Sequence, residues 1–302
     1  MSRYLGTWLL ILGFVFFGGI CSATTQPNGD PLVQSVDQTG LQSMPVEATS
    51  TPNEDSPPEA IATPSSATST MTNEQIQDLW RSAGLSGKLT VADFPGNGNR
   101  PAAIYLPPTL DPSKPVKLVI FFHGHYWNIG DQFQKLNVLA RLKDLETKNP
   151  NTVFVTPQAD KPPFSYWMKP PEESFAAFSS QAMKEAARLA GVSSLEISQR
   201  IVSAHSGGGL ALRTAVQTNQ FVADKIELLD ANYNDWGMVL TKWSKSFPQG
   251  KRPPITTWNT PGSTATHDQE ILKEAPDIVT VNKSAVPHND IPGKYLGTTI
   301  DQ

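Results

Sequence analysis

The feature that most constrains the fold is an alternation of short apolar, β-branched runs with longer stretches of helical periodicity. Residues 116–122 (VKLVIFF) and 152–157 (TVFVTP) have the continuous apolar character of strands that are buried on both faces. Four further runs are strand-like: RIVSA at 200–204, KIELLD at 225–230, ITTWN at 255–259 and IVTV at 278–281. LTVADF and AAIYLP, at 89–94 and 102–107, predict an antiparallel pair that precedes them.

Helices are expected between these strands, at residues 131–148, 174–190 and 208–218. In the second of them one helical face carries Phe175, Phe178, Ala182, Ala186 and Leu189. Gly191 follows that helix where a C-cap glycine belongs. The alternation of strands and helices predicts an α/β domain, with a mostly parallel central sheet and helices on both faces.

The first 23 residues have the pattern of a secretory signal sequence. The apolar run at 5–20 follows a single basic residue and is short of the about 20 residues that span a bilayer. Cleavage after Ala23 is expected, because Ile20 is not the small residue that bacterial lipoprotein signals place before their cysteine. The alternatives are lipidation of Cys21 and a retained membrane anchor. Export is therefore predicted, to the periplasm or the medium, with lipid anchoring only through Cys21.

Two further segments follow the signal sequence. Residues 24–70 contain no aromatic residue, no Lys and no Arg, and their Pro, Ser and Thr content predicts a disordered, mildly acidic linker. Residues 71–302 are rich in aromatic and apolar runs and predict a single domain. Cys21 is the one cysteine of the chain, so no disulfide is expected, which fits a bacterial exported protein. The net charge of −4 excludes a generally basic nucleic-acid binder.

Polar side chains follow the predicted strands at the point where each strand ends. His123 comes after the first buried strand, Ser206 after the third, Asp230 after the fourth, and His288 lies beyond the last. Because ligands of such sheets bind beyond the carboxyl ends of the strands, these side chains should converge on one edge.

The residues around Ser206 resemble a known motif. Ala204 to Gly208 (AHSGG) is similar to the G-x-S-x-G nucleophile elbow of the α/β-hydrolase superfamily, with Ala in place of the first Gly. FFHGH, at 121–125, resembles the H-G segment that completes the oxyanion hole in that superfamily. The resemblance extends over about residues 89–296. It implies a serine nucleophile held on a strained turn between a strand and a helix.

The superfamily places its catalytic residues in the order Ser, acid, His along the chain. The resemblance therefore implies that His288 is the general base, with His267 as its rival. Asp230 is the preferred acid, and the alternatives are Asp235, Asp268 and Asp290.

The resemblance implies a serine hydrolase that cleaves an ester or amide through an acyl-enzyme on Ser206. The N–H groups of Gly207 and of Gly124 or His125 would form the oxyanion hole. No metal or organic cofactor is implied. The expected substrate is an ester or amide, either in a small molecule or linked to a polymer of the cell envelope or to a carbohydrate. The protein is expected to be a monomer. No nucleic-acid partner is expected, and membrane contact only through the N-terminal segment if Cys21 is lipidated.

Two other classes of protein stay open from the sequence. A metal-dependent hydrolase could use the pair His123 and His125, completed by His205, Asp230, His267 or His288. A non-catalytic glycan- or cell-wall-binding module could use an aromatic platform. The aromatic residues expected in loops after strands, which could also bind the substrate of an enzyme, are Tyr126, Trp127, Tyr166, Trp167, Tyr233 and Trp236.

Overall fold

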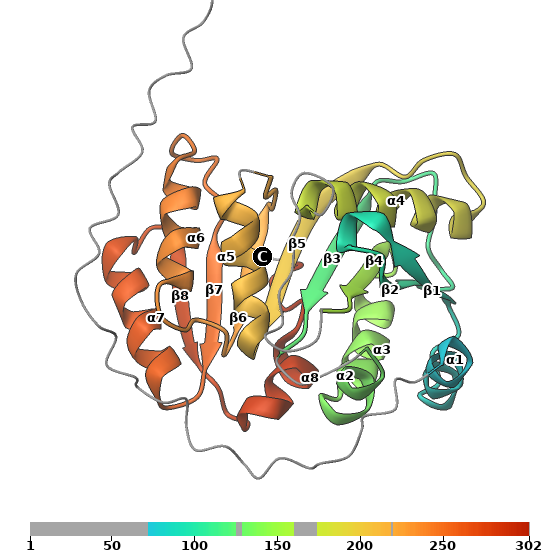
Figure 1. Cartoon of the computed structure of the whole chain (residues 1–302), viewed down its shortest axis with the longest axis horizontal. Coiled ribbons are helices and arrows are strands. Elements are labelled where there is room, and N and C mark those ends of the chain that lie inside the picture. Colours follow the sequence, from blue (N-terminus) through green and yellow to red (C-terminus); the bar gives the residue numbers. More distant parts are fainter. Residues whose placement is uncertain (1–71, 125–128, 160–173, 219, 302) are drawn as a thin grey trace, which may run out of the picture. The chain divides into compact units, whose positions relative to one another are not determined.

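The computed structural model describes residues 72–124, 129–159, 174–218 and 220–301 (Figure 1). These residues belong to one unit, Ser66–Gln302. The predicted signal sequence (1–23) and linker (24–70) lie outside the described residues, so both stay predictions.

The described residues form one sheet of eight strands in the order β1-β2-β4-β3-β5-β6-β7-β8. β1 pairs with β2, and β2 with β4, in antiparallel fashion, and every other pair is parallel. The predicted α/β class, with its mostly parallel sheet and leading antiparallel pair, is thus confirmed. The strands are β1 Lys88–Phe94, β2 Arg100–Leu106, β3 Val116–Phe122, β4 Thr152–Pro157, β5 Ile197–His205, β6 Lys225–Leu229, β7 Ile255–Asn259 and β8 Val279–Lys283.

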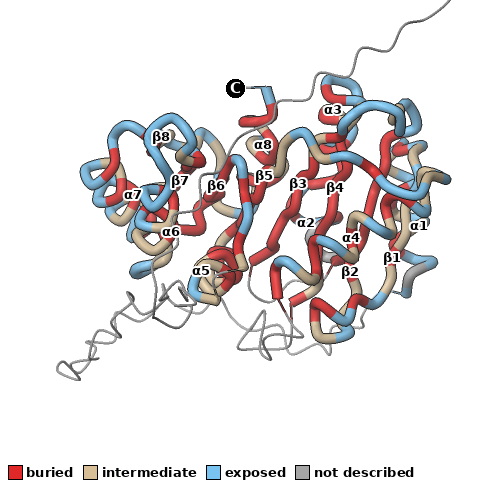
Figure 2. Tube along the Cα trace, turned by 90° about the horizontal axis from the view of Figure 1, so that it is seen from above, coloured by how far each residue is buried: buried red, intermediate tan, exposed pale blue. Residues whose placement is uncertain are grey.

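Helices cover both faces of this sheet, because successive side chains of each central strand point to opposite sides. In β3, Leu118 and Ile120 pack into one core, whereas Val119 and Phe121 pack into the other. The first core also receives α4 Phe175–Ala190, α5 Gly209–Gln217, α6 Trp236–Lys245 and α7 Ser263–Glu274. The second receives α1 Asn73–Ser82, α2 Ile129–Lys135, α3 Val138–Lys148 and α8 Ile291–Tyr295. Figure 2 shows β3, β4, β5 and β6 buried along most of their length between these layers.

The predicted helix at 174–190 forms as α4, capped at both ends. The Ser174 hydroxyl accepts a hydrogen bond from the backbone N–H of Ala177, and Gly191 ends the helix in the left-handed region at φ 81°. These caps satisfy backbone groups that have no partner within the helix.

The structure differs from the predicted helices in several places. The helix expected at 131–148 is divided into α2 and α3, because Asn137 adopts the left-handed conformation at φ 52°. Helix α1, which begins at a capping box between Thr72 and Gln75, was not predicted. Helix α6 was not predicted either, and Trp236, expected in a loop, is its first residue.

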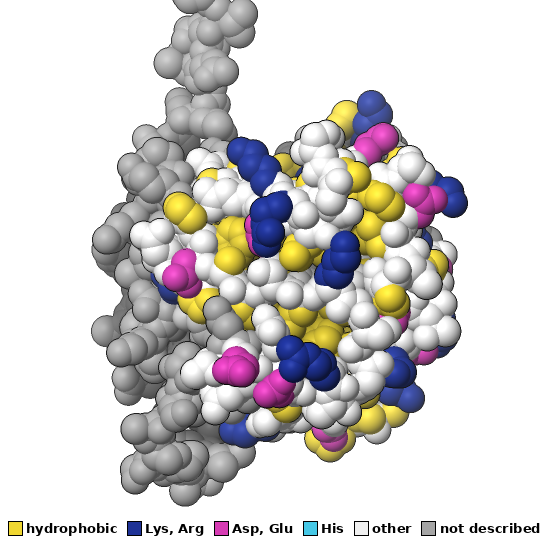
Figure 3. All heavy atoms as spheres, turned by 90° about the vertical axis from the view of Figure 1, so that its right-hand side faces the viewer, with side chains coloured by type: hydrophobic (Ala, Val, Ile, Leu, Met, Phe, Trp, Pro, Cys, Tyr) yellow, Lys and Arg dark blue, Asp and Glu magenta, His cyan; other side chains and the backbone are white. Residues whose placement is uncertain are grey.

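Figure 3 shows one face of the domain on which Lys and Arg side chains are interspersed with Asp and Glu side chains. Neither sign of charge forms a continuous field on this face. Among the residues with described structure, no helix combines the length and the apolar character needed to cross a bilayer.

Candidate active site

Ser206 stands on a sharp turn between β5 and α5. Its φ is 51°, in the left-handed region that residues other than glycine rarely adopt. One turn of 3₁₀ helix (Ser206–Gly208) leads from it into α5. The turn is closely packed: a methyl group on Gly208 would lie 2.3 Å from the carbonyl oxygen of Phe122. Ala204 is fully buried between its partners on β3 and β6. These contacts explain why small residues flank the serine.

The segment after β3 lies directly against this turn. A methyl group on Gly124 would approach the Cβ of Ser206 to 2.9 Å, so only glycine fits there. The buried His123 holds the segment, because its Nδ1–H donates to the carbonyl of Gly124 at 2.9 Å and its Nε2 accepts from the N–H of Ala159 at 3.4 Å. His125, expected beside Gly124, lies outside the described residues.

His288 and Asp230 meet at the carboxyl edge of the sheet, although 58 positions separate them in the chain. Asp230 follows β6, and His288 begins a 3₁₀ turn, His288–Asp290, after β8. His288 Nδ1 donates to Asp230 Oδ2 at 2.7 Å. The side chain of Asp230 is only 2% exposed, whereas that of His288 is 34% exposed. A buried carboxylate therefore holds one nitrogen of a solvent-accessible imidazole.

Asp230 is kept ionised by the groups that surround it. The Oγ1 and N–H of Thr260 donate to its two oxygens at 2.5 and 3.2 Å, and the hydroxyl of Thr264 donates as well. Burial alone would raise the pKa of Asp230, but the hydrogen bonds from His288, Thr260 and Thr264 outweigh it and hold the pKa below its ordinary value. Asp230 is thus a fixed negative charge next to His288.

His205, the residue before the serine, contacts both the backbone and the ring of His288. Its Nε2–H donates to the backbone carbonyl of His288 at 3.0 Å, and the two rings lie 4.5 Å apart, tilted by 37°. Burial, reinforced by the charge of His288, lowers the pKa of His205 to about 3. His205 therefore stays neutral and serves as a hydrogen-bond donor.

Tyr233 lies on the same edge as Ser206. Burial and the charge of Asp230 raise its pKa to about 12, against the opposing effect of a hydrogen bond with the Ser206 side chain. Its ring packs edge-on against Trp236 at 5.6 Å. Tyr233 therefore adjoins the serine, and Trp236 packs against Tyr233. The other aromatic residues expected there, Tyr126, Trp127, Tyr166 and Trp167, lie outside the described residues.

The alternative acids and the rival base have partners elsewhere. Asp235 forms an ion pair with Arg213 at 2.8 Å. Asp268 accepts from Asn232 and Asn259 at 2.9 and 2.7 Å. Asp290 accepts a long hydrogen bond of 3.5 Å from Asn137, and His267 contacts Glu270 at 3.1 Å. Asp230 is thus the carboxylate that meets His288.

Of the two histidines in the alternative metal pair, His123 lies within the described residues and His125 does not. Both ring nitrogens of His123 form hydrogen bonds with the backbone. Within residues 72–124, 129–159, 174–218 and 220–301, no three His, Cys, Asp or Glu side chains gather as a metal site requires.

Sequence reasoning missed the residues that support the acid and the base. Thr260 follows β7 and Thr264 lies at the start of α7, and His205 was considered only as a metal ligand. The sequence signal that could have found Thr260 is its position immediately after the strand at 255–259, whereas Thr264 lies within α7 and His205 is the last residue of β5.

No protein-family model matches the chain, and no curated protein matches it. Its structure is similar to a solved ferulic acid esterase, with a TM-score of 0.51 at 11% identity, over 71% of this chain and 95% of the esterase. It is also similar to an S-formylglutathione hydrolase from Staphylococcus aureus, with a TM-score of 0.50 at 12% identity, over 72% of this chain and 96% of the hydrolase. Together with the strand order and the serine turn, these similarities show that the chain has the α/β-hydrolase fold.

Proposed function

We propose that the protein is a serine hydrolase that cleaves a carboxylic ester or amide through an acyl-enzyme on Ser206. The observation that carries the proposal is the buried Asp230 carboxylate on Nδ1 of His288, at the sheet edge where Ser206 adopts its left-handed turn. This is the arrangement by which an acid, a histidine and a serine activate an otherwise weak nucleophile.

The chemistry begins with neutral His288. Because its Nδ1–H is donated to Asp230, the proton-free nitrogen is Nε2, which accepts the hydroxyl proton of Ser206. Oγ of Ser206 then bonds to the carbonyl carbon of the substrate, whose C=O electron pair becomes an oxyanion. When the oxyanion collapses, the bond to the leaving group breaks and the leaving group takes the proton from His288.

Water completes the cycle. His288 removes a proton from a water molecule, which adds to the acyl carbon, and the Ser206 ester bond breaks with return of the proton to Oγ. Throughout, Asp230 stabilises the imidazolium form of His288 without taking its proton, consistent with its lowered pKa.

The backbone supplies the oxyanion hole in this proposal. Gly207 stands in the first turn that leads into α5, where N–H groups have no partner within a helix. Gly124 lies against the Cβ of Ser206, and the second donor would be the backbone N–H of Gly124 or of His125. Loss of one such donor typically lowers kcat by about 10²- to 10³-fold.

The substrate is proposed to be an ester rather than an amide. Support comes from the two solved structures named above, which are described as an esterase and as a hydrolase of S-formylglutathione. Tyr233 and Trp236 provide an apolar, hydrogen-bonding surface beside Ser206 that suits an acyl group or a sugar face. An ester on a cell-envelope or carbohydrate polymer remains the proposed natural substrate.

Hydrolysis of p-nitrophenyl acetate and butyrate tests the proposal, with 4-nitroanilides as the amide counterparts. We expect ester turnover that Ser206→Ala lowers by about 10⁴-fold or more, since removal of a triad serine costs up to about 10⁶-fold. Ser82→Ala, which changes an exposed serine at the end of α1, should keep the wild-type rate. Equal activity in the Ser206→Ala variant would refute the proposal.

A further inference from the structure

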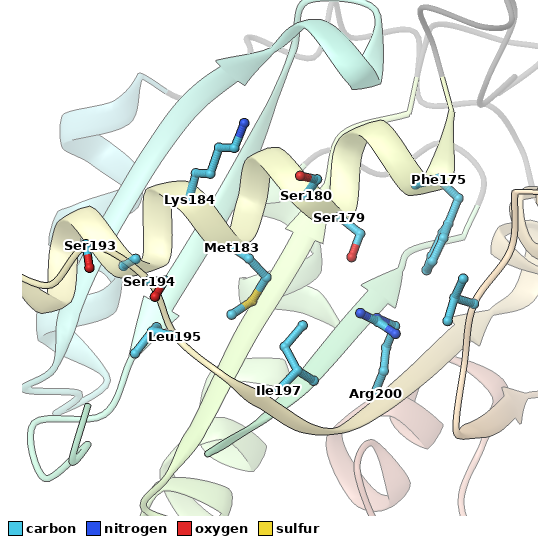
Figure 4. Close-up of a pocket in the computed structure, with 13 residues that line it drawn as sticks. Phe175, Ser179, Ser180, Met183, Lys184, Ser193, Ser194, Leu195, Ile197 and Arg200 are labelled. Atoms are coloured by element: carbon cyan, nitrogen blue, oxygen red, sulfur yellow. The ribbon is translucent and has the colours of Figure 1, made fainter. Parts of the chain in front are cut away.

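A cavity of about 400 Å³ lies along α4, away from the serine turn (Figure 4). Its walls come from α4, the connection from α4 to β5, the first half of β5 and Val222 ahead of β6. None of Ser206, Asp230 and His288 lines it. A volume of this size is within the range of about 300 to 1,000 Å³ that small-molecule sites have.

Figure 4 shows how the side chains meet in this cavity. Met183 on α4 and Ile197 on β5 approach one another, and the hydroxyl of Ser179 and the guanidinium of Arg200 face the same space. Lys184 points away from it. Every described lining residue is apolar, a serine or a cation, so the cavity has no carboxylate of its own.

Arg200 has no charged partner on these walls. Its Nε is inaccessible to solvent and has no hydrogen-bond partner. Asp224 accepts a hydrogen bond from the backbone N–H of Arg200 at 2.6 Å, but it forms no ion pair with the guanidinium. Burial lowers the pKa of Arg200, and the nearby charge of Asp224 offsets only part of that effect.

Most arginines in the described part of the chain are paired. Five of them form ion pairs with carboxylates: Arg81, Arg141, Arg188, Arg213 and Arg252. A half-buried guanidinium without such a partner is costly, because desolvation is not compensated by an opposite charge. An anion that enters the cavity would remove that cost.

The surroundings of Arg200 narrow the chemistry of that anion. One unpaired guanidinium matches a single negative charge, and its planar fork fits a carboxylate through two parallel hydrogen bonds. Apolar walls continue beyond Arg200, and they include Val222, which is 49% exposed. A monoanion with an apolar body therefore satisfies both parts of the cavity.

We propose that this cavity is a second ligand site, which binds a small carboxylate attached to an aromatic or branched aliphatic body, with Arg200 as the partner of the carboxylate. Ser179, whose hydroxyl faces the same cavity, would contribute a further donor, and Phe175, Met183, Ile197 and Val222 would enclose the apolar body. The site uses no residue of the proposed catalytic machinery, so it stands whether or not the protein is a hydrolase.

Titration of the full chain with 2-naphthylacetate, followed by ligand-detected NMR, tests this site. The neutral isostere 2-(2-naphthyl)ethanol measures how much of the affinity depends on the negative charge. We expect the carboxylate to bind with a dissociation constant below about 1 mM and the alcohol to bind at least about tenfold more weakly. That ratio corresponds to the loss of one charge-assisted contact of about 1.4 kcal/mol.

Three variants locate the binding. Arg200→Met, which keeps an unbranched apolar stem but removes the guanidinium, should weaken binding of the carboxylate at least about tenfold and leave binding of the alcohol unchanged. Arg188→Met, on the exposed side of α4, should change neither affinity. Ser180→Trp places a large ring at an exposed position on the cavity wall and should abolish binding with Arg200 intact. This variant tests the site even if Arg200→Met fails to fold. Any of three results would overturn the site: no carboxylate binding below about 1 mM, equal affinity for the alcohol, or an unchanged affinity in folded Arg200→Met or Ser180→Trp protein.

Discussion

At the scale of single residues, the electrostatics of the site depend on how Asp230 is held. Its carboxylate accepts four hydrogen bonds, two from Thr260, one from Thr264 and one from His288. The three hydrogen bonds from the threonines hold the carboxylate in place independently of His288. The proposed base therefore meets an acceptor that is already ionised and immobile.

Asp230→Asn should keep the fold and lose activity. The amide cannot stabilise the imidazolium and favours the wrong tautomer of His288, a change that lowers kcat by about 10⁴-fold in a comparable triad. The rate of p-nitrophenyl butyrate hydrolysis checks this, with Asp235→Asn as the matched control because Asp235 is paired with Arg213 outside the site. Comparable losses in both variants would contradict the role given to Asp230.

The buried His205 predicts a pH dependence of stability. Its pKa is about 3 in the folded protein and 6.5 as a free side chain, so between these values the unfolded state binds more protons. The free energy of unfolding should therefore fall as the pH drops below about 6.5, by up to about 1.4 kcal/mol per pH unit from this residue.

Urea denaturation between pH 7 and 4.5 measures that slope above the range in which Asp230 titrates. His205→Gln, which keeps a donor for the carbonyl of His288, should show a smaller slope than the wild-type protein. His267→Gln on α7, where the imidazole is 29% exposed, should change the slope less than His205→Gln does. An unchanged slope in His205→Gln would show that His205 is not held neutral by burial.

At the scale of secondary-structure elements, a buried glutamate in β6 helps to attach the carboxyl-terminal residues to the sheet. The fully buried Glu227 accepts hydrogen bonds from Ser203 Oγ at 2.5 Å and from the N–H groups of Gly297 and Thr299 at 2.8 and 2.9 Å. The hydroxyl of Thr299 donates to it as well, at 2.8 Å. The segment after α8 is thereby attached to the middle of the sheet.

Glu227→Gln should destabilise the domain by about 1 to 3 kcal/mol, because the amide presents a donor where the site supplies only donors. The midpoint of urea denaturation gives the change, and Glu274→Gln on the surface of α7 provides the comparison, with a smaller expected effect because this carboxylate is exposed. If the two variants unfold at the same midpoint, the attachment through Glu227 contributes no stability.

The sequence predicted the elements whose pattern is local and failed where tertiary contacts decide. Strands β3, β4 and β7 were located at their observed bounds, since each is a short run rich in apolar and β-branched residues. Helix α6 was missed because Trp, Val and Thr are poor helix formers, and packing such as that of Trp243 on Phe221, 4.8 Å apart, stabilises it. The break at Asn137 likewise has no sequence signal beyond the tolerance of Asn for left-handed φ.

The candidate site was also predictable only in part. The order of the strands brings Ser206, Asp230 and His288 to one edge, and the resemblance of the elbow pointed to these three residues. Thr260, Thr264 and His205 were not predicted in their supporting roles, because each acts through a contact between elements that are distant in sequence.

At the scale of the whole molecule, the fold says less about the function than the geometry of the site does. The α/β-hydrolase fold is shared with solved structures that have only 11% to 12% identical residues, so it says little about the substrate. The proposed chemistry depends instead on the geometry around Ser206. Export through residues 1–23 and the linker at 24–70 stay predictions.

Intact-mass spectrometry after treatment with a fluorophosphonate probe tests the central claim most directly. An activated serine attacks phosphorus and keeps the adduct, whereas an ordinary hydroxyl does not react. The account predicts one adduct per chain, mapped to Ser206, that is absent in Ser206→Ala and present in Ser82→Ala. A folded protein without an adduct, or with its adduct on another residue, would contradict an activated nucleophile at Ser206.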